Sequence, residues 1–221
     1  MRVTKTIQIT VTGVLAVTVT PVTPKGYVGV DAYVDVAWSP SPSGDYDIAV
    51  QWGDGTSVAD ASMSSPKRVG PKKYTAPGTY TVTITVVEPV YGYQGTGTTT
   101  IQVANPLTAT LGAAPTSGPA PLAVTFTLGA AEGWLPYTWS LDPGDGSAPY
   151  TGSRTAKGNW TQAHTYMKAG THTSTLTVTD ALGATTLTRV TARTYAPAGL
   201  PSAAAILTPL VAGLILLKGR R

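Results

Sequence analysis

One four-residue motif occurs twice in the chain and fixes its organisation. Gly53-Asp54-Gly55-Thr56 recurs as Gly144-Asp145-Gly146-Ser147, 91 positions later. A second motif follows each copy, because residues 74–79 recur as residues 166–171, displaced by 92 positions. Repetition of motifs in the same order at a near-constant spacing is typical of duplicated structural units. The sequence therefore predicts two copies of one domain.

A strand-like run follows each copy of the second motif. After Gly78 and after Gly170, threonine alternates with other residues, most of them apolar. Successive side chains of a strand point to opposite faces of its sheet, so the apolar residues should face a core and the threonines should face water. The residues expected to face the core are Tyr80, Val82, Ile84, Val86, Leu176 and Val178.

Shorter alternating runs occur elsewhere in the chain and are separated by turn-rich segments. They cover residues 32–38, 47–52, 98–103, 122–128 and 184–192. The chain has 24 glycines and 18 prolines, which favour turns, and no segment before residue 199 has a helical period. Short strands at this spacing indicate a β-sandwich or a barrel. The sequence therefore predicts an all-β fold.

The motifs of both copies resemble those of the PKD domain, an immunoglobulin-like β-sandwich of seven strands. The matching positions are Trp52, 53–56, Tyr74 and 77–80 in the first copy, and 121–127, Trp139, 144–147, 164–166 and 170–171 in the second. The resemblance covers residues 15–104 and 107–194. It implies two tandem immunoglobulin-like sandwiches, preceded by a strand segment at 1–14 and followed by a linker and tail at 195–221.

Both copies depart from the PKD pattern. In the first copy Lys72 stands where the family has histidine, and Val50 stands where it usually has tryptophan. In the second copy Asp142-Pro143 is inserted before the Gly-Asp-Gly motif, and His172 and Ser174 replace the usual tyrosine and valine. The fold should survive these changes. We expect Trp52 and Trp139 to be buried at corresponding places.

The Gly-Asp-Gly motifs are predicted to be structural turns. Glycine reaches positive φ without steric cost, and an Asp side chain can accept bonds from nearby backbone amides. Calcium binding by the motif carboxylates is the alternative, with help from Asp45, Asp47 or Asp142. The pairs Asp45/Asp47 and Asp31/Asp35 are further metal candidates. Calcium takes six to eight oxygen ligands, which a single carboxylate does not supply. The residues assigned to these turns are Gly53, Asp54, Gly55, Gly144, Asp145 and Gly146.

No catalytic constellation is visible in the sequence. Catalysis needs a nucleophile with a base, paired carboxylates or a metal. The chain has no cysteine, its only glutamates are Glu88 and Glu132, and it lacks a nucleophile elbow or phosphate loop. His164 and His172 are expected to pack or form hydrogen bonds rather than bind zinc. The chain is therefore predicted to be no enzyme and to need no cofactor.

The net charge of +4 is too small to indicate nucleic-acid binding. Two basic clusters lie at 67–73 and 218–221, without the dense basic face or the reading motif of such proteins. Glycans or proteins are the alternative partners, through Trp134 and Trp160, which stand in loop-like sequence. The same two rings would equally serve to cover an end of a sandwich.

The C-terminal tail changes character, since residues 200–217 contain no charged residue. A helix of this length, at about 1.5 Å per residue, approaches the ~30 Å hydrocarbon core of a bilayer. The basic residues 218–221 follow directly, as the positive-inside rule expects. Packing against another protein chain is the alternative, because Thr208 and Pro209 interrupt the run. The predicted anchor residues are Leu200, Ile206, Leu207, Leu210, Val211, Leu214, Ile215, Leu216 and Leu217.

The N-terminal residues resemble a signal peptide only loosely. Thr6, Thr10 and Thr12 give a strand-like alternation instead, and no Ala-x-Ala cleavage site follows. We therefore expect a surface protein, on a virion or a cell envelope, that joins other protein subunits and is held by its tail. The alternative is a carbohydrate- or protein-binding accessory module of a secreted hydrolase.

Overall fold

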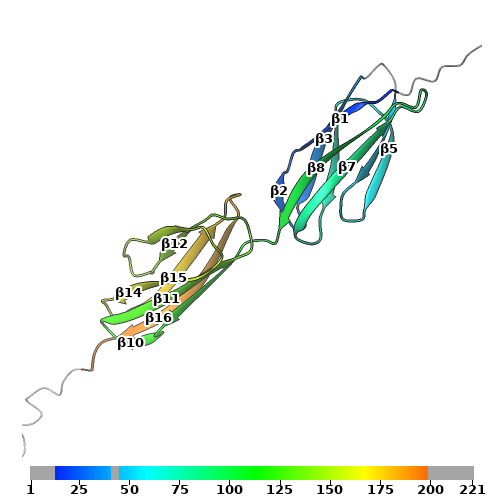
Figure 1. Cartoon of the computed structure of the whole chain (residues 1–221). Coiled ribbons are helices and arrows are strands. Elements are labelled where there is room, and N and C mark those ends of the chain that lie inside the picture. Colours follow the sequence, from blue (N-terminus) through cyan, green and yellow to red (C-terminus); the bar gives the residue numbers. More distant parts are fainter. Residues whose placement is uncertain (1–12, 41–44, 199–221) are drawn as a thin grey trace, which may run out of the picture. The chain divides into compact units, whose positions relative to one another are not determined.

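A computed structural model describes residues 13–40 and 45–198 of the chain (Figure 1). Among these residues every regular element is a β-strand. The chain divides into two compact units, and each contains a sandwich of a three-stranded and a five-stranded sheet. The first sandwich is made of strands β1 to β8, and the second of strands β9 to β16. The predicted all-β fold with two sandwiches is confirmed.

The first sandwich pairs most of its strands with antiparallel neighbours. Its smaller sheet has the order β1-β3-β6 and its larger sheet the order β2-β8-β7-β4-β5. Only the short β2 runs parallel to its neighbour, β8. The bounds are β1 Ala16–Pro21, β2 Lys25–Tyr27, β3 Asp31–Ser39, β4 Tyr46–Gln51, β5 Ser57–Met63, β6 Lys67–Lys73, β7 Gly78–Val87 and β8 Gln94–Ala104.

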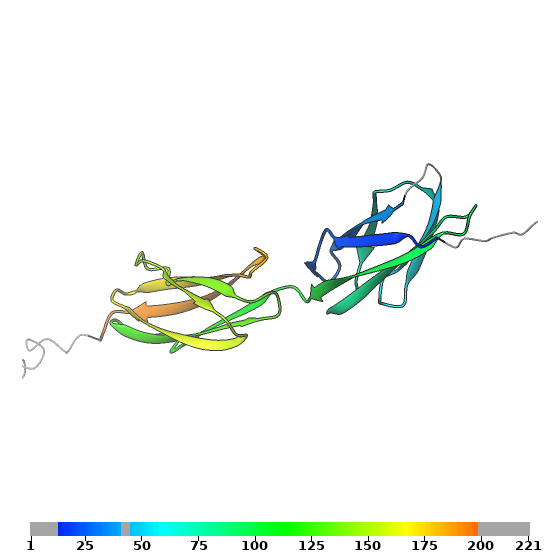
Figure 2. The same cartoon turned by 45° about the horizontal axis from the view of Figure 1, so that its top comes forward.

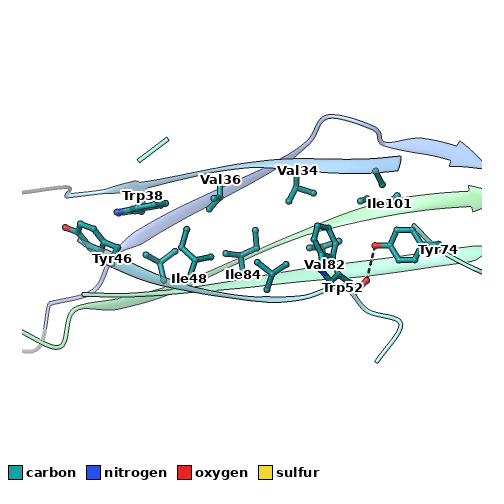
Figure 3. Close-up of a cluster of buried hydrophobic side chains, with 14 of the residues drawn as sticks. Val34, Val36, Trp38, Tyr46, Ile48, Trp52, Tyr74, Val82, Ile84 and Ile101 are labelled. Atoms are coloured by element: carbon teal, nitrogen blue, oxygen red, sulfur yellow. Dashed lines mark hydrogen bonds between the residues drawn. The ribbon is translucent and has the colours of Figure 1, made fainter. Parts of the chain in front are cut away.

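The core of the first sandwich lies between its two sheets. Val34, Val36 and Trp38 of β3 face the strands of the larger sheet, among them β4 with Ile48 and β7 with Ile84 (Figure 3). All five are buried, and each large apolar side chain taken from water contributes about 1.5–3 kcal/mol. The predicted inward residues of β7 are confirmed as buried from Val82 to Val86, and Tyr80 is partly buried.

The second sandwich repeats this arrangement (Figure 2). Its smaller sheet has the order β14-β11-β9, and its larger sheet the order β10-β16-β15-β12-β13, again with a short parallel strand at one edge. The bounds are β9 Thr108–Ala114, β10 Ser117–Pro119, β11 Leu122–Ala131, β12 Tyr137–Asp142, β13 Tyr150–Arg154, β14 Gly158–Tyr166, β15 Gly170–Thr179 and β16 Thr185–Tyr195. Leu176 and Val178 are fully buried, as predicted.

One predicted core position is wrong. Trp52 is buried, but Trp139 is only half-buried and does not occupy the corresponding place. Trp52 directly precedes Gly53, and the residue directly before Gly144 is the buried Pro143. The tyrosine that follows β6 and the tyrosine that ends β14 confirm this equivalence. The Tyr74 hydroxyl donates to the carbonyl of Trp52, and the Tyr166 hydroxyl donates to the carbonyl of Pro143. The inserted proline displaces the tryptophan toward the start of its strand.

Two predicted segments fall outside the described residues. The tail anchor at 200–217 does so entirely, and of the N-terminal segment 1–14 only Gly13 and Val14 are described. Within residues 13–40 and 45–198 there is no helix long and apolar enough to cross a membrane.

Candidate functional site

The first Gly-Asp-Gly motif forms a tight turn after β4. Asp54 Oδ1 accepts bonds from the backbone N and the hydroxyl of Thr56, at 3.1 and 2.6 Å. Gly53 and Gly55 have φ values of 79° and 86°, in the region that favours glycine. A Cβ on Gly53 would also lie 2.6 Å from the carbonyl oxygen of Thr81, so no larger residue fits. The predicted turn is present in the structure.

Lys72 of β6 completes this turn. Its Nζ lies 2.6 Å from Asp54 Oδ2 and donates to the Thr56 hydroxyl at 2.6 Å. The ammonium also lies 5.4 Å from the centre of the Tyr74 ring, within the range of a cation–π contact. The lysine therefore joins the smaller sheet to the turn that leaves the larger sheet.

The second motif forms the same turn with a different base. Asp145 Oδ1 accepts from the backbone N and the hydroxyl of Ser147, at 3.0 and 2.6 Å. Its Oδ2 lies 2.9 Å from Nε2 of His164, whose Nδ1 is 3.1 Å from the hydroxyl of Tyr150. His164 thus holds the position that Lys72 holds in the first sandwich. His164 and Lys72 therefore make the same carboxylate contact in the two sandwiches.

Both aspartates keep their charge strongly. Burial alone would raise the pKa of Asp54, but the bonds from Lys72 and Thr56 outweigh it and lower the pKa to about 2. Burial likewise opposes ionisation of Asp145, and the bonds from Ser147 and His164 lower its pKa to about 2. The carboxylates are therefore ionised in nearly all solution conditions.

This geometry bears directly on the calcium alternative. Both oxygens of each carboxylate already accept bonds from protein donors, so a cation would have to displace Lys72 or His164. Asp142, a proposed helper, instead accepts a bond from the backbone N of Gly144 at 2.8 Å. In the described part of the chain no three His, Cys, Asp or Glu side chains cluster as metal ligands would. The turns fit a structural role better than a cation site.

A stacked ring pair lies behind each turn. Tyr74 and Tyr80 stack at 4.0 Å between ring centres, and Tyr166 and His172 stack at 4.2 Å. Burial raises the pKa of Tyr74 to about 12, so its hydroxyl stays protonated and donates to the Trp52 carbonyl. Both histidines thus pack against rings and lie within hydrogen-bond distance of protein groups, as we expected.

Ser174 shows how the second copy accommodates its departures. Ser174 stands at the position that the apolar Val82 has in the first copy. Its side chain is fully buried, and its hydroxyl lies 3.0 Å from the Pro143 carbonyl and 2.8 Å from the Tyr166 hydroxyl. His172, in place of Tyr80, reaches the Thr194 hydroxyl at 3.1 Å. Each buried polar group therefore gains a partner that removes the cost of its burial.

The two candidate binding tryptophans lie on different elements. Trp160 lies on β14 and not in a loop; its ring centre is 5.7 Å from that of Trp139, and the guanidinium of Arg154 lies 5.3 Å from it. Trp134 lies in the loop after β11, and its backbone N donates to Asp180 at 2.9 Å. Both side chains are half-buried, and no ring contact joins them among the described residues. Their role in binding stays a prediction.

Sequence reasoning missed a cavity in the first sandwich. It has a volume of about 560 Å³ and lies between the edge strands β5 and β6, where Ile48 and Trp52 form part of its lining. The signal that could have found it is a comparison of the two copies, since Ile48 and Trp139 both stand five residues before their Gly-Asp-Gly motifs. The first copy has the smaller Ile48 where the second copy has the larger Trp139.

Comparisons with known proteins agree with this architecture. Residues 108–192 match the family model of the PKD domain. No curated protein matches the chain in sequence. An I-band fragment of titin is similar in structure with a TM-score of 0.59 and 9% identity, over 81% of this chain and 65% of the titin fragment. This likeness shows the immunoglobulin-like fold alone.

Two further solved structures match with lower TM-scores than the titin fragment. The PKD domain of a peptidase from a Thermoplasmatales archaeon has 20% identity and a TM-score of 0.34, over 41% of this chain and 94% of that domain. The fibronectin(III)-like modules of CbhA from Clostridium thermocellum have 17% identity and a TM-score of 0.38, over 80% of this chain and 93% of theirs. The predicted tandem immunoglobulin-like architecture is confirmed, and its second copy matches the PKD family.

Proposed function

We propose that this chain is a non-enzymatic structural and interaction protein, displayed on the surface of a virion or a cell envelope. The C-terminal tail holds it there, and the two sandwiches extend the exposed part. Its partners are other protein subunits of the same surface, and its Trp134 and Trp160 are candidate contacts for proteins or glycans. Immunoglobulin-like and PKD modules are typical of binding and structural proteins, which supports this role.

One observation carries the proposal. The ionisable side chains of the two turns are consumed in holding the fold, because Asp54 pairs with Lys72 and Asp145 pairs with His164. A catalytic group needs a free base or nucleophile beside a site for substrate. These pairs instead connect one sheet to the other. The two turns therefore offer no reacting group, and the proposed contacts with partners are made by surfaces and strand edges.

The tail supports a location at a membrane. Residues 200–217 lack charge and are followed by Lys218, Arg220 and Arg221. A continuous apolar segment of this length left in water drives association, which soluble monomers avoid. The described strands by contrast expose rows of threonine, such as Thr79 and Thr81 of β7. The location of the chain should therefore depend on its last twenty or so residues, a length that approaches one bilayer crossing.

A liposome flotation experiment tests this function. The full chain is compared with a variant that ends at Ala198, and both are mixed with vesicles of neutral and anionic phospholipid. We expect the full chain to float with the vesicles, because the apolar tail enters the bilayer, and the shortened variant to stay in the dense fraction. Equal behaviour of the two proteins would contradict the membrane anchor. Oligomers that only the full chain forms without lipid would mean that the tail packs on other subunits.

A further inference from the structure

The first sandwich is open along one side. The sheet orders place β5 and β6 at the edges of the larger and smaller sheet, and the cavity of about 560 Å³ lies between them. Its lining includes the core residues Ile48, Val50 and Trp52 and the partly buried Val69. Ligand sites in proteins commonly have volumes of about 300–1,000 Å³. Charged side chains, among them Asp60, Lys67 and Arg68, also line the space. Its volume and the apolar part of its lining therefore suit a bound group. We call this space the β5–β6 groove.

The second sandwich fills the corresponding space with its own side chains. Trp139 and Trp160 lie 5.7 Å apart there. The counterpart of Trp139 in the first sandwich is Ile48, which stands the same number of residues before its turn. The counterpart of Trp160 is Lys67, because Lys67 lies opposite Val36 of β3 as Trp160 lies opposite Leu128 of β11. Two indoles are therefore replaced by one smaller apolar side chain and one charged chain. The β5–β6 groove is the space that those rings leave.

The edges of the groove are suited to receive a strand. Within the described residues β5 pairs only with β4, and β6 pairs only with β3. The outer backbone groups of both strands thus lack a strand partner, and such edges readily pair with an added strand. All residues of β5 except Met63 are exposed, so the edge is accessible. An added strand with one apolar face would gain backbone bonds and would cover the groove.

The chain carries a segment with this pattern in residues 3–11, outside the described residues. Its odd positions are Val3, Lys5, Ile7, Ile9 and Val11, and its even positions are Thr4, Thr6, Gln8 and Thr10. The same parity continues into the described residues, where Leu15, Val17 and Val19 pack against the core. At about 3.3 Å per residue, nine residues in strand form span roughly 30 Å, enough to follow the seven residues of β5.

The described part of the chain begins away from the groove of its own copy. β1, which follows the segment, lies at the opposite edge of the smaller sheet from β6. It packs beside β8, where a Cβ on Gly97 would lie 2.8 Å from the carbonyl oxygen of Val17. The chain therefore enters the sandwich on the closed side. A groove of another copy is the natural acceptor.

We propose that residues 3–11 of one copy insert as a strand into the β5–β6 groove of a second copy, with Ile7 and Ile9 facing Ile48 and Val69. The contact joins two different surfaces of the chain, so repetition in one direction produces chains of subunits. This inference rests on the proposed function, because it identifies the partner subunit as a second copy of the chain.

Cysteine cross-linking tests the register of the contact. The chain has no cysteine of its own, so each introduced thiol is unique. Full-length Ile9→Cys is mixed with full-length Val69→Cys in detergent and oxidised, and the mixed disulfide is quantified on a non-reducing gel. We expect at least a fivefold higher yield than with the matched Gln8→Cys control, whose side chain lies on the other face. Equal yields for the two positions would overturn the proposal.

Sedimentation velocity of full-length variants gives a second, independent test. Ile7→Lys with Ile9→Lys should abolish the subunit chains, while Thr6→Lys with Gln8→Lys, which adds the same charge to the other face, should retain them. Assembly of both pairs to the same extent would refute strand insertion. Liposome flotation of the same variants separates the two proposals, since a failed insertion leaves flotation intact, whereas a failed anchor abolishes flotation of every variant.

Discussion

At the scale of single residues, the two Gly-Asp-Gly turns use one carboxylate in the same way with different bases. Asp54 meets the ammonium of Lys72 and Asp145 meets the ring of His164. All four side chains are largely buried, so the contacts are less screened than surface pairs. The second sandwich therefore depends on an ionised Asp145, whose pKa the fold lowers to about 2. The contribution of this carboxylate to stability should depend on pH.

Asp145→Asn tests the acid side of this dependence. The pKa of Asp145 is lowered from 3.8 to about 2 in the fold, so its ionised form stabilises the native state above about pH 4 and loses this contribution as the pH falls through 2. The stabilisation is on the order of 2 kcal/mol. We expect the variant to melt at lower temperature at pH 7, with a smaller decrease in Tm between pH 4 and pH 2. Asp60→Asn, on exposed β5, is the control.

At the scale of elements, alternation was the reliable signal. Val82, Ile84 and Val86 could be placed inward from the sequence because a strand has a period of two. The place of Trp139 could not, because the inserted Pro143 takes the position before the turn and only the tertiary contact of Tyr166 with its carbonyl identifies it.

The Ile48 side of the β5–β6 groove could be predicted by comparing the two copies, but the Lys67 side could not, for a related reason. In β6 two residues, Gly70 and Pro71, lie opposite the single Tyr33 of β3. The residues of β6 before Gly70 are therefore shifted by one position relative to the equivalent residues of β14. Counting along the sequence therefore makes Arg68 the equivalent of Trp160 in the first copy. The strand register shows that the structural equivalent is Lys67. The space depends on side chains from strands that are not neighbours in sequence.

The two tryptophans before the turns give a matched prediction. Trp52→Ala should destabilise the first sandwich by about 3–5 kcal/mol, because it truncates a buried aromatic ring of the core. Trp139→Ala should cost less, because its side chain is partly exposed and the truncation removes less buried surface. Chemical denaturation followed by tryptophan fluorescence measures both. Equal losses of unfolding free energy would show that Trp139 is a core residue like Trp52.

At the scale of the whole molecule, the chain joins a duplicated, polar-covered β-structure to an apolar tail. The duplication keeps the turns but not the surfaces, since the first sandwich is open at β5 and β6 where Trp139 and Trp160 close the second. Two copies of one fold can thereby serve different purposes. In the proposed account the first sandwich binds a neighbouring subunit, and the second connects it to the tail.

Protease protection on the native surface is the most direct test of the central claim, that the sandwiches are displayed outside a membrane that holds the tail. Intact virions or cells bearing the chain are treated with a broad protease, and the remaining fragments are identified by mass spectrometry. The account predicts that residues 13–198 are digested while peptides from 200–217 remain until detergent is added. Full protection of the sandwiches before detergent, or digestion of the tail together with them, would contradict it.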